Sequence, residues 1–507
     1  MRNAIRPSRT IPSTLLLLLA GLLIAGLLPG VASGQDSNTE GDPEPAVLVP
    51  QAEEPRTDAW GANRRFGLAV SEIFLTNFAA WAFNEFPRNA AFSQVNPQSW
   101  WYNIEQGFQW DDNHFSTNHF AHPYQGAMYF NAFRSNGYNF WESSPAAFAG
   151  SFLWECCGET HLMSLNDLIN TGMGGIALGE MLYRTSSMVL DNTSSGSSRV
   201  GKEIAGFFIN PVRGATRLIT GRAGEVAPNP EHPSDRRPDI LFTTLTTGYR
   251  AINPEVTTDD PEHGAFFELG VQFGSPFELD RSQPFDFFEL RADINTSDVK
   301  ALGRLQVTGN LYHTVIGDPY ESKHRFVVYQ NFDYFNNLAY EFGGQSVSAA
   351  ILSRWPVGES GRWGLFTSLD GYLMPMGAVN ADFSFLAEIP GVRENLRSYD
   401  FGVGGGARGD FKIFREGRRI FELSYRGTYL NTLNGSVTNG SDAQHWVQMG
   451  FARGQVPIGP NWGLGADLTF FIRDSFYSLE ELEDTRQRSP QFRAYATWTA
   501  GSRQAPN

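Results

Sequence analysis

The stretch that decides the fold is residues 462–473, WGLGADLTFFIR. Apolar side chains recur at every second position, with small or polar side chains between them, so that Leu468 and Phe470 flank Thr469. Successive side chains of a β-strand point to opposite faces, and the pattern therefore predicts a strand with one apolar and one polar face. The same alternation recurs in residues 288–294, 421–429 and 492–498.

Twelve segments carry strand signals of this kind in the second half of the chain. They are 239–250, 264–275, 285–296, 299–313, 323–335, 338–353, 362–374, 398–414, 419–432, 443–456, 461–474 and 490–501. The connections after odd-numbered segments include the long ones (251–263, 375–397 and 475–489), and those after even-numbered segments are short, such as 416–418 and 457–460. Long loops at one rim, tight turns at the other and an even strand count are typical of an outer-membrane barrel. Two short odd connections, 297–298 and 336–337, depart from this regularity.

A soluble β-sandwich is the alternative fold, and its strands would also alternate. It does not account for the Trp and Tyr side chains near many strand ends or for strands of more than ten residues, which a bilayer-crossing barrel requires. The chain is also rich in aromatic residues, with 40 Phe, 17 Tyr and 12 Trp. We therefore predict a membrane β-barrel of about 12 antiparallel strands over residues 238–501, preceded by a small α-helical domain over residues 59–225.

The first residues carry the features of a secretory signal peptide. Arg2, Arg6 and Arg9 form a basic region before an apolar run, and small residues favour cleavage before Gln35. Loss of residues 1–34, which hold three arginines and no acid, takes the formal net charge from −15 to about −18. Such acidity argues against nucleic acid as a partner. Residues 35–58 are acidic and contain proline, so they are expected to form a disordered linker.

Two further features bound the class of protein. The two cysteines, Cys156 and Cys157, are adjacent and could close only a strained ring, so no disulfide framework is expected. Past the signal, no apolar run is expected to reach the roughly 18 residues of a membrane-spanning helix. An exported, aromatic-rich chain of this kind favours a barrel, because a barrel also satisfies the backbone groups in lipid.

Helical patterns occupy the region between the linker and the first strand. Residues 65–86 have helical spacing, with Leu68, Ile73, Phe74, Phe78 and Trp81 along one side, and residues 87–111 are expected to form a loop. Pro123 is expected to open a helix that ends near Gly137, and Pro145 to open one that reaches Cys157. Further helices are expected from Ser164 and over 201–208 and 211–220.

The block from Asp112 to Arg184 holds the residues that could carry chemistry. His119 and His122 form an H-x-x-H pair, with His114, Glu155, Glu159 and His161 nearby in sequence. Imidazole and carboxylate groups suit zinc and similar ions, so His119 and His122 are candidate metal ligands. The two histidines fall at a loop–helix junction instead of at helical spacing, and hydrogen bonds to helix ends are the alternative role. No cofactor is indicated.

A catalytic arrangement can also be drawn from this block. His122 would act as a general base oriented by Glu155 or Asp167, and Arg134 would hold an anionic group such as a lipid phosphate. Ser143, Ser151 or Ser164 would supply a nucleophile for acyl transfer or lipid hydrolysis. No G-x-S-x-G motif is present. An ion pair between Arg134 and Glu155 that joins two helices is the structural alternative.

Other residues of the block are expected to have structural roles. Asp167 lies three residues after Ser164, as in a helix capping box. Gly175 and Gly179 form a G-x-x-x-G pattern, which favours close helix packing. Glu180 and Arg184 are spaced for an ion pair within one helix.

The block resembles the bacterial family known as domain of unknown function 3943, over about residues 100–220. The matching residues are Asn118, His122-Pro123-Tyr124-Gln125-Gly126, Tyr129, Arg134-Ser135-Asn136-Gly137, Phe140-Trp141-Glu142-Ser143, Ser151, Leu153-Trp154-Glu155, Glu159, Ser164, Asn166-Asp167-Leu168, Gly174-Gly175 and Gly179-Glu180. The resemblance implies an exported, envelope-associated protein of Gram-negative type, often with a barrel-like second half. It groups His122, Arg134, Glu155 and Asp167 into one set and transfers no activity. Cys156, Cys157 and His119 depart from the family pattern.

Two functions follow as hypotheses. The first is a non-enzymatic outer-membrane protein, with the helical domain as a plug in the lumen or a module on the periplasmic side, and with a scaffold, channel or lipid-binding role. The second is a membrane hydrolase or acyltransferase that uses His122 with Glu155 or Asp167. Outer-membrane lipid is the expected partner, with the barrel-assembly machinery during biogenesis, and the oligomeric state is left open.

Overall fold

The computed structural model describes residues 63–111, 113–230, 238, 240–253, 260–277, 283–296, 301–318, 322–358, 362–380, 399–433, 436–437 and 441–503. The predicted signal peptide (1–34) and linker (35–58) lie outside these residues, as does most of the predicted connection 375–397.

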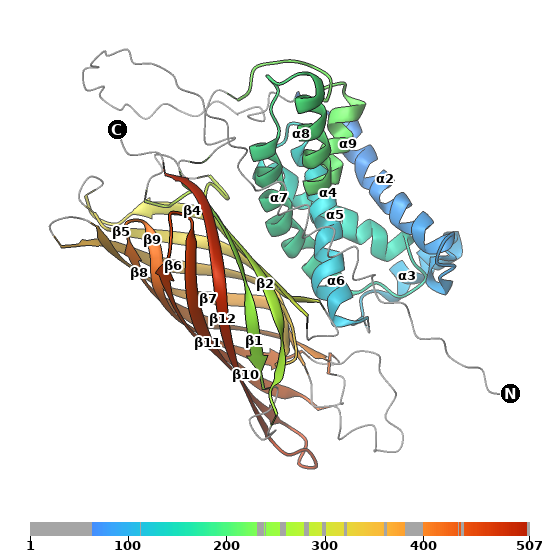
Figure 1. Cartoon of the computed structure of the whole chain (residues 1–507). Helices are drawn as coiled ribbons and strands as arrows, with labels where there is room; N and C mark the ends of the chain where they lie inside the picture. The colour runs from blue at the N-terminus through green and yellow to red at the C-terminus, as the bar shows by residue number, and fades with distance from the viewer. Residues whose placement is uncertain are drawn as a thin grey trace.

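Twelve strands form a closed antiparallel barrel in which each strand pairs with its neighbours in sequence (Figure 1). They are β1 (Ile240–Ile252), β2 (Glu262–Phe273), β3 (Phe288–Asn295), β4 (Leu302–Val315), β5 (His324–Asn336), β6 (Glu341–Val357), β7 (Trp363–Asn380), β8 (Tyr399–Arg415), β9 (Arg418–Thr432), β10 (Ala443–Pro457), β11 (Trp462–Tyr477) and β12 (Thr485–Arg503). β1 closes the barrel against β12, from Ile240 opposite Arg503 to Ile252 opposite Gln491. The predicted fold class is confirmed, and each predicted strand overlaps one of these.

The side of the wall that each residue faces follows from contacts between strands that are not neighbours. Arg453 on β10 bonds Glu268 on β2 at 2.7 Å, and Arg426 on β9 bonds Asp333 on β5 at 2.7 Å. Such contacts can only cross the lumen, so these polar side chains point inward. Their neighbours along each strand point outward, because side chains alternate between the two faces.

The outward-facing neighbours of the lumen residues are mostly apolar. They are Leu269, Leu305, Phe332, Tyr334, Leu423, Ala452 and Leu468. The predicted arrangement, with polar side chains inside and apolar side chains outside, is confirmed by this alternation.

The two rims of the barrel differ in their connections. We call the rim where β1 begins and β12 ends the termini rim, and the other the opposite rim. At the termini rim, β8 and β9 are joined through 416–417 and β10 and β11 through 458–461, as predicted. The connection 274–287, also at this rim, is longer than the pattern predicts. This connection contacts the helices, since Asp286 accepts a hydrogen bond from Arg184 at 3.3 Å.

Helices form the first half of the described chain, and we call residues 66–219 the helical module. Its elements are α2 (Phe66–Glu85), α3 (Pro97–Gln106), α4 (His122–Arg134), α5 (Phe140–Cys157), α6 (Leu165–Ile169), α7 (Gly175–Val189), α8 (Gly196–Ile209) and α9 (Pro211–Ile219). Two π-helical turns, η2 (Thr117–Ala121) and η3 (Asn170–Gly174), precede α4 and α7.

Several helices differ from the prediction, including α8, which begins at Gly196 instead of residue 201. Helix α3 lies in the segment predicted to be a loop, where Asn96 caps the helix and Pro97 opens it. Helix α5 begins at Phe140 instead of Pro145, because Asn139 and Glu142 form a capping box. Pro123 does open α4, but the π turn η2 runs directly into that helix.

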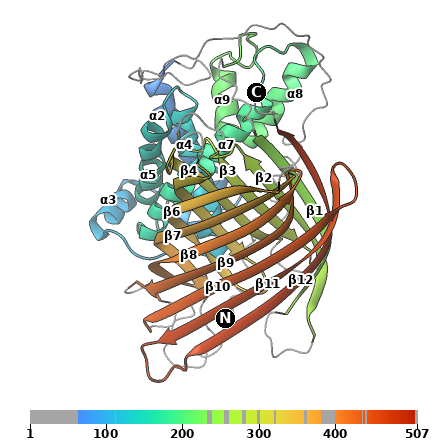
Figure 2. The same cartoon turned by 90° about the vertical axis from the view of Figure 1, so that its left-hand side faces the viewer.

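The helical module packs against the outside of the barrel wall (Figures 1 and 2). The ring of Phe115 lies 5.4 Å from that of Tyr334 on β5, and Trp110 stacks on Phe401 of β8 at 5.5 Å. Outward-facing side chains of β2 to β5 share one hydrophobic core with the helices: Leu269, Leu290, Leu305, Val307 and Phe332 with Phe130, Ala177, Met181 and Leu182. These contacts lie on the outer face, and the prediction of a plug in the lumen is not confirmed.

Glycines allow α4 and α7 to approach closely. A Cβ on Gly126 would lie 1.9 Å from Thr171 O, and one on Gly175 would lie 2.4 Å from the backbone of Gly126. A Cβ on Gly179 would lie 2.7 Å from the ring of Phe130. The predicted role of the G-x-x-x-G pattern in helix packing therefore agrees with the geometry.

Candidate functional site

The predicted site residues fall into two separate groups. We call the first the acid–histidine cluster; it consists of Asp111, His122, Glu155, Glu159 and Asp167. His122 Nε2 lies 3.8 Å from Asp167 Oδ2; the Asp167 side chain is buried and that of His122 is 11% exposed. The cluster lies beside the opposite rim, because Asn118, on the adjacent turn, donates a hydrogen bond to Tyr399 Oη at 2.7 Å and Tyr399 is the first residue of β8.

Backbone and amide groups hold the acids of this cluster in place. Ser164 N donates to Glu155 Oε2 at 2.8 Å, and Asn166 Nδ2 donates to Asp167 Oδ1 at 2.8 Å. Asp111 N donates in turn to Asn166 Oδ1 at 3.0 Å. Asp111 and Asn166 were not predicted as site residues, although Asn166 belongs to the resemblance.

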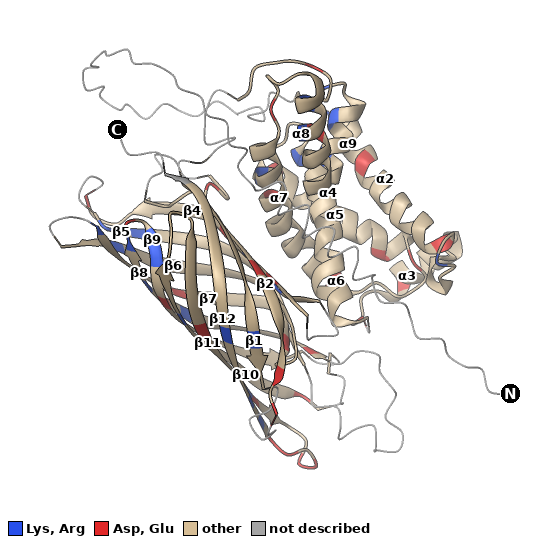
Figure 3. Ribbon diagram, in the orientation of Figure 1, with Lys and Arg blue, Asp and Glu red and all other residues tan. Residues whose placement is uncertain are grey.

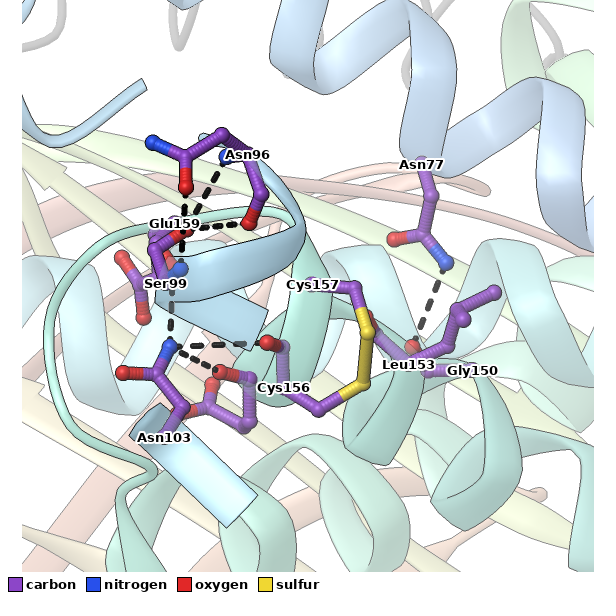
Figure 4. The surroundings of a disulfide bond; sticks show 10 residues. Asn77, Asn96, Ser99, Asn103, Gly150, Leu153, Cys156, Cys157 and Glu159 are labelled. Atoms are coloured by element: carbon purple, nitrogen blue, oxygen red, sulfur yellow. Dashed lines mark hydrogen bonds between the residues drawn. A yellow bond between two sulfur atoms is a disulfide. The ribbon is translucent and has the colours of Figure 1, made fainter. Parts of the chain in front are cut away.

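Asn103 and the two cysteines border the cluster (Figure 4). Asn103 Nδ2 donates to Glu159 O at 3.0 Å and lies 3.4 Å from both Glu155 O and Cys156 O. Cys156 and Cys157 are joined by a disulfide bond between adjacent residues. No disulfide framework was predicted, and the one bond found links neighbours and joins no distant segments.

Burial sets the electrostatics of the cluster. It raises the pKa of Glu155 to about 8 and raises the pKa values of Glu159 and Asp167 well above their usual range, with the other acids adding to the rise. It lowers the pKa of His122. Among the described residues, no lysine or arginine forms an ion pair with Glu155, Glu159 or Asp167. His122, Glu155, Glu159 and Asp167 therefore favour their uncharged forms near neutral pH.

His119 lies on the π turn η2, between the cluster and the barrel. Its ring stacks on Phe115 at 4.6 Å and meets Tyr399 at 5.7 Å. Neither ring nitrogen has a hydrogen-bond partner among the described residues. Burial lowers the pKa of His119 to about 3, and the histidine is neutral. In the part of the chain that the structure describes, no group of three His, Cys, Asp or Glu side chains is arranged to hold a metal ion.

The serines proposed as nucleophiles do not contact His122. Ser143 Oγ donates to Asn139 O at 2.7 Å, and Ser151 Oγ lies 3.4 Å from Asp167 O. The hydroxyl of Ser164 lies 3.5 Å from Leu162 O. Each hydroxyl is therefore engaged elsewhere, and the geometry gives no support to a hydrolase that uses them.

Arg134 belongs to the second group and not to the acid–histidine cluster. Its guanidinium bonds Glu180 at 2.8 and 3.2 Å, and Arg184 bonds the same carboxylate at 2.9 Å. The predicted pair of Glu180 with Arg184 is present, whereas the Arg134–Glu155 pair is wrong. Close packing of α4 on α7 brings Arg134 to Glu180 instead. Arg184 then reaches Pro284 O at 3.0 Å, which ties the module to the barrel connection.

The remaining motif residues have structural positions. Gly137 has a positive φ of 89° just after α4, a conformation that glycine adopts at low cost. Trp141 is exposed, and its ring lies edge-on to Phe140 at 4.9 Å.

The barrel lumen holds a network of ion pairs that was not predicted from the sequence. Glu268 on β2 accepts hydrogen bonds from Arg304, Arg453 and Arg493, on β4, β10 and β12. Asp467 bonds Arg453 at 3.0 Å and Arg493 at 2.8 Å. We call these five residues the lumen network. Charged residues at alternate positions of the predicted strands indicated charges on the inner face of the barrel. No sequence pattern, however, shows which strands face one another across the lumen.

A cavity of about 440 Å³ lies inside the barrel. Its lining includes side chains near the termini rim, such as Phe242, Trp363 and Phe414, and charged side chains such as Arg291, Arg408 and Lys412. Arg291 bonds Glu422 at 2.7 Å, and Arg408 bonds Asp370 at 2.8 Å.

Comparisons with known proteins match one family model and several solved structures. Residues 107–212 match the family model described as domain of unknown function (DUF3943). Among solved structures, a NanC porin is 10% identical with a TM-score of 0.26 and covers 51% of this chain and 99% of its own. A KdgM porin is 8% identical with a TM-score of 0.22, and the match covers 50% of this chain and 98% of the porin. An outer membrane channel from Pseudomonas putida F1 is 10% identical with a TM-score of 0.25, and the match covers 51% of this chain and 95% of the channel. No curated protein matches the chain.

Proposed function

We propose that this chain, whose residues 107–212 carry the domain of unknown function 3943, is an outer-membrane scaffold whose barrel holds the helical module and is closed to ions. The observation that carries the proposal is the position of Glu268. Its carboxylate joins arginines from three other strands, so charged side chains meet across the lumen at this level.

The outer face of the barrel supports a membrane location. On the wall away from the helices, outward-facing side chains such as Leu369, Leu423 and Leu468 are exposed. A band of apolar side chains outside and charged side chains inside is the arrangement of outer-membrane barrels. A soluble protein would expose this wall to water at a large free-energy cost.

The side chains in the lumen favour a scaffold role and not an open pore. The arginines and acids of the lumen network are paired with one another, and burying such charges is tolerable only when each has its partner. Opening the lumen would separate these pairs. The helical module, in turn, is fixed to the wall by a shared hydrophobic core.

Conductance in planar bilayers tests the closed lumen. The purified wild-type protein is expected to give no steady ion current. A variant that combines Glu268→Ala, Arg453→Ala and Arg493→Ala is expected to conduct, because the side chains that cross the lumen are removed. The matched control is Leu369→Ala, which trims an outward-facing side chain on β7.

Two results would contradict the proposal. One is a steady current through the wild-type protein. The other is a triple variant that folds, as judged by its heat-modifiable mobility on gels, and still carries no current. Fractionation of cells tests the location, and recovery of the folded protein outside the outer membrane would overturn it.

A further inference from the structure

The outward face of helix α2 has an inverted pattern of polarity. Phe74, Phe78 and Phe83 are each more than half exposed, whereas Glu72 and Asn77 are buried. A helix on the surface of a soluble domain places its apolar residues toward the core. In Figure 3 the helices of the module are mostly tan, and charged residues occupy short stretches.

The buried polar side chains of α2 explain how this face is oriented. Glu72 accepts hydrogen bonds from Asn136 and Thr216, both at 2.8 Å. Asn77 donates to Gly150 O at 3.3 Å. These bonds attach α2 to α5, α9 and the end of α4, so the phenylalanines cannot turn inward without breaking them.

Helix α2 extends along the height of the barrel wall. At the start of α2, Phe66 packs on Phe133. Phe133 precedes Arg134, which bonds Glu180 together with Arg184, and Arg184 bonds Asp286 of the connection 274–287 at the termini rim. At its far end, Trp81 donates to Ser93 O, and the neighbouring Phe92 packs on His161 beside the acid–histidine cluster. That cluster lies level with the opposite rim. The module therefore occupies the same layer as the barrel wall.

The length and composition of α2 agree with this position. It has 20 residues and is long and apolar enough to cross a membrane, which corrects the expectation that no such segment follows the signal. At 1.5 Å per residue it is about 30 Å long, the thickness of the hydrocarbon core of a bilayer. A core helix of a soluble protein meets the same criterion but is mostly buried, and α2 is not.

Apolar side chains are also exposed on other helices. Val200 and Ile204 on α8 and Leu218 and Ile219 on α9 are exposed. Trp101 and Tyr102 on α3 are exposed near the far end of α2, and such aromatic side chains favour the membrane interface.

We propose that the outward face of helix α2, together with the exposed apolar side chains of α8 and α9, contacts the acyl chains of membrane lipid beside the barrel. The inference rests on the proposed membrane location of the barrel and adds a helical segment to its lipid-facing surface. The observations that favour lipid over a protein partner are the layer that the module shares with the wall and the length of α2.

Fluorescence quenching in proteoliposomes tests the proposal. Single cysteines, introduced as Phe78→Cys on α2 and Ile204→Cys on α8 in a background with Cys156→Ser and Cys157→Ser, carry a bimane label. Brominated phosphatidylcholine quenches from the lipid and iodide quenches from the water. Leu369→Cys on the outward face of β7 is the lipid control, and Glu480→Cys in the connection 478–484 is the water control.

The labels at positions 78 and 204 are expected to be quenched by brominated lipid to an extent comparable with position 369, and to be shielded from iodide. If position 369 responds to lipid but position 78 responds to iodide, the face is in water and the inference is wrong. If position 78 is shielded from both quenchers, a protein covers it and the inference is also wrong. If position 369 itself does not respond to lipid, the proposed membrane location fails instead.

Discussion

The lumen of the barrel and the helical module each bury a group of acidic side chains, and the two groups have different partners. In the lumen, Glu268 and Asp467 bond several arginines. In the acid–histidine cluster, Glu155 accepts a hydrogen bond from a backbone N–H, and no lysine or arginine pairs with it among the described residues. Acids that bond arginines link strands, whereas buried acids without a lysine or arginine partner favour the protonated form. The lumen acids are therefore balanced by arginines, whereas burial raises the pKa values of Glu155, Glu159 and Asp167 in the module.

Removal of a paired acid is expected to have the largest effect. Glu268→Ala removes the carboxylate that Arg304, Arg453 and Arg493 all bond, and breaking a buried ion pair costs about 3–5 kcal/mol. We expect a matching fall in the free energy of unfolding, measured by urea titration of the refolded protein. Glu480→Ala, in an exposed connection, is the control. An equal effect of both substitutions would contradict the role of the network.

A paired acid within the module gives the next comparison. Arg134→Ala leaves Glu180 with Arg184 alone, so the loss is expected to be smaller than for Glu268→Ala, on the order of 1–3 kcal/mol for the lost charge-assisted hydrogen bonds. Thermal unfolding followed by tryptophan fluorescence measures it. No loss would show that Arg134 is not structural and would reopen its role in binding an anion.

The buried acids of the module make the stability of the protein depend on pH. The pKa of Glu155 is raised from 4.5 to about 8 in the folded protein. Between these values the folded state binds more protons than the unfolded state, so stability falls as pH rises. Below about pH 6.5, protonation of His122 in the unfolded state opposes this effect, because its folded pKa is lowered.

The effect of Glu155 on stability is therefore best measured between about pH 6.5 and 8. In this range the free energy of unfolding is expected to fall less steeply with pH in Glu155→Gln than in the wild type, by up to about 1.4 kcal/mol per pH unit. The variant is expected to be more stable than the wild type near pH 8. Glu159 and Asp167 have raised pKa values too, so some dependence remains. The melting temperature against pH measures the effect, and identical profiles for wild type and variant would contradict it.

An exposed ion pair gives the smallest expected effect. Arg64 and Glu142 lie 2.6 Å apart, with side chains 47% and 33% exposed. Arg64→Ala is expected to cost about 1 kcal/mol or less, since water screens exposed pairs. A loss as large as that of Arg134→Ala would remove the distinction between buried and exposed pairs.

The barrel could be predicted from the sequence because its strands face the lumen on one side and the outside on the other. Polar and apolar residues therefore alternate with a period of two. Glu422 and Arg426 point into the lumen while Leu423 and Tyr425 point outward, as the alternation predicts. The docking of the module could not be predicted in this way. Leu305 and Phe332 face helices and Leu423 and Leu468 are exposed, but all are apolar and the sequence does not separate the two cases.

The candidate site could be predicted only in part. His122 and Asp167 do lie close together, and Glu155 belongs to the same cluster. Arg134 was assigned to the wrong acid, because spacing along α4 does not show whether α5 or α7 faces it. Helix α3 was missed although Asn96 and Pro97 are cap and opening residues, because its exposed aromatic residues give no helical period.

Photo-cross-linking tests the central claim, that the module lies on the outer wall and not in the lumen. p-Benzoyl-phenylalanine in place of Tyr399, which contacts Asn113 and Asn118, is compared with the same group in place of Tyr329, which lines the cavity in the lumen. After irradiation of outer membranes, digestion and mass spectrometry locate the cross-links. We expect position 399 to cross-link to residues 113–119 and position 329 to give no cross-link to the module. Cross-links to the module from position 329, with none from position 399, would contradict the account.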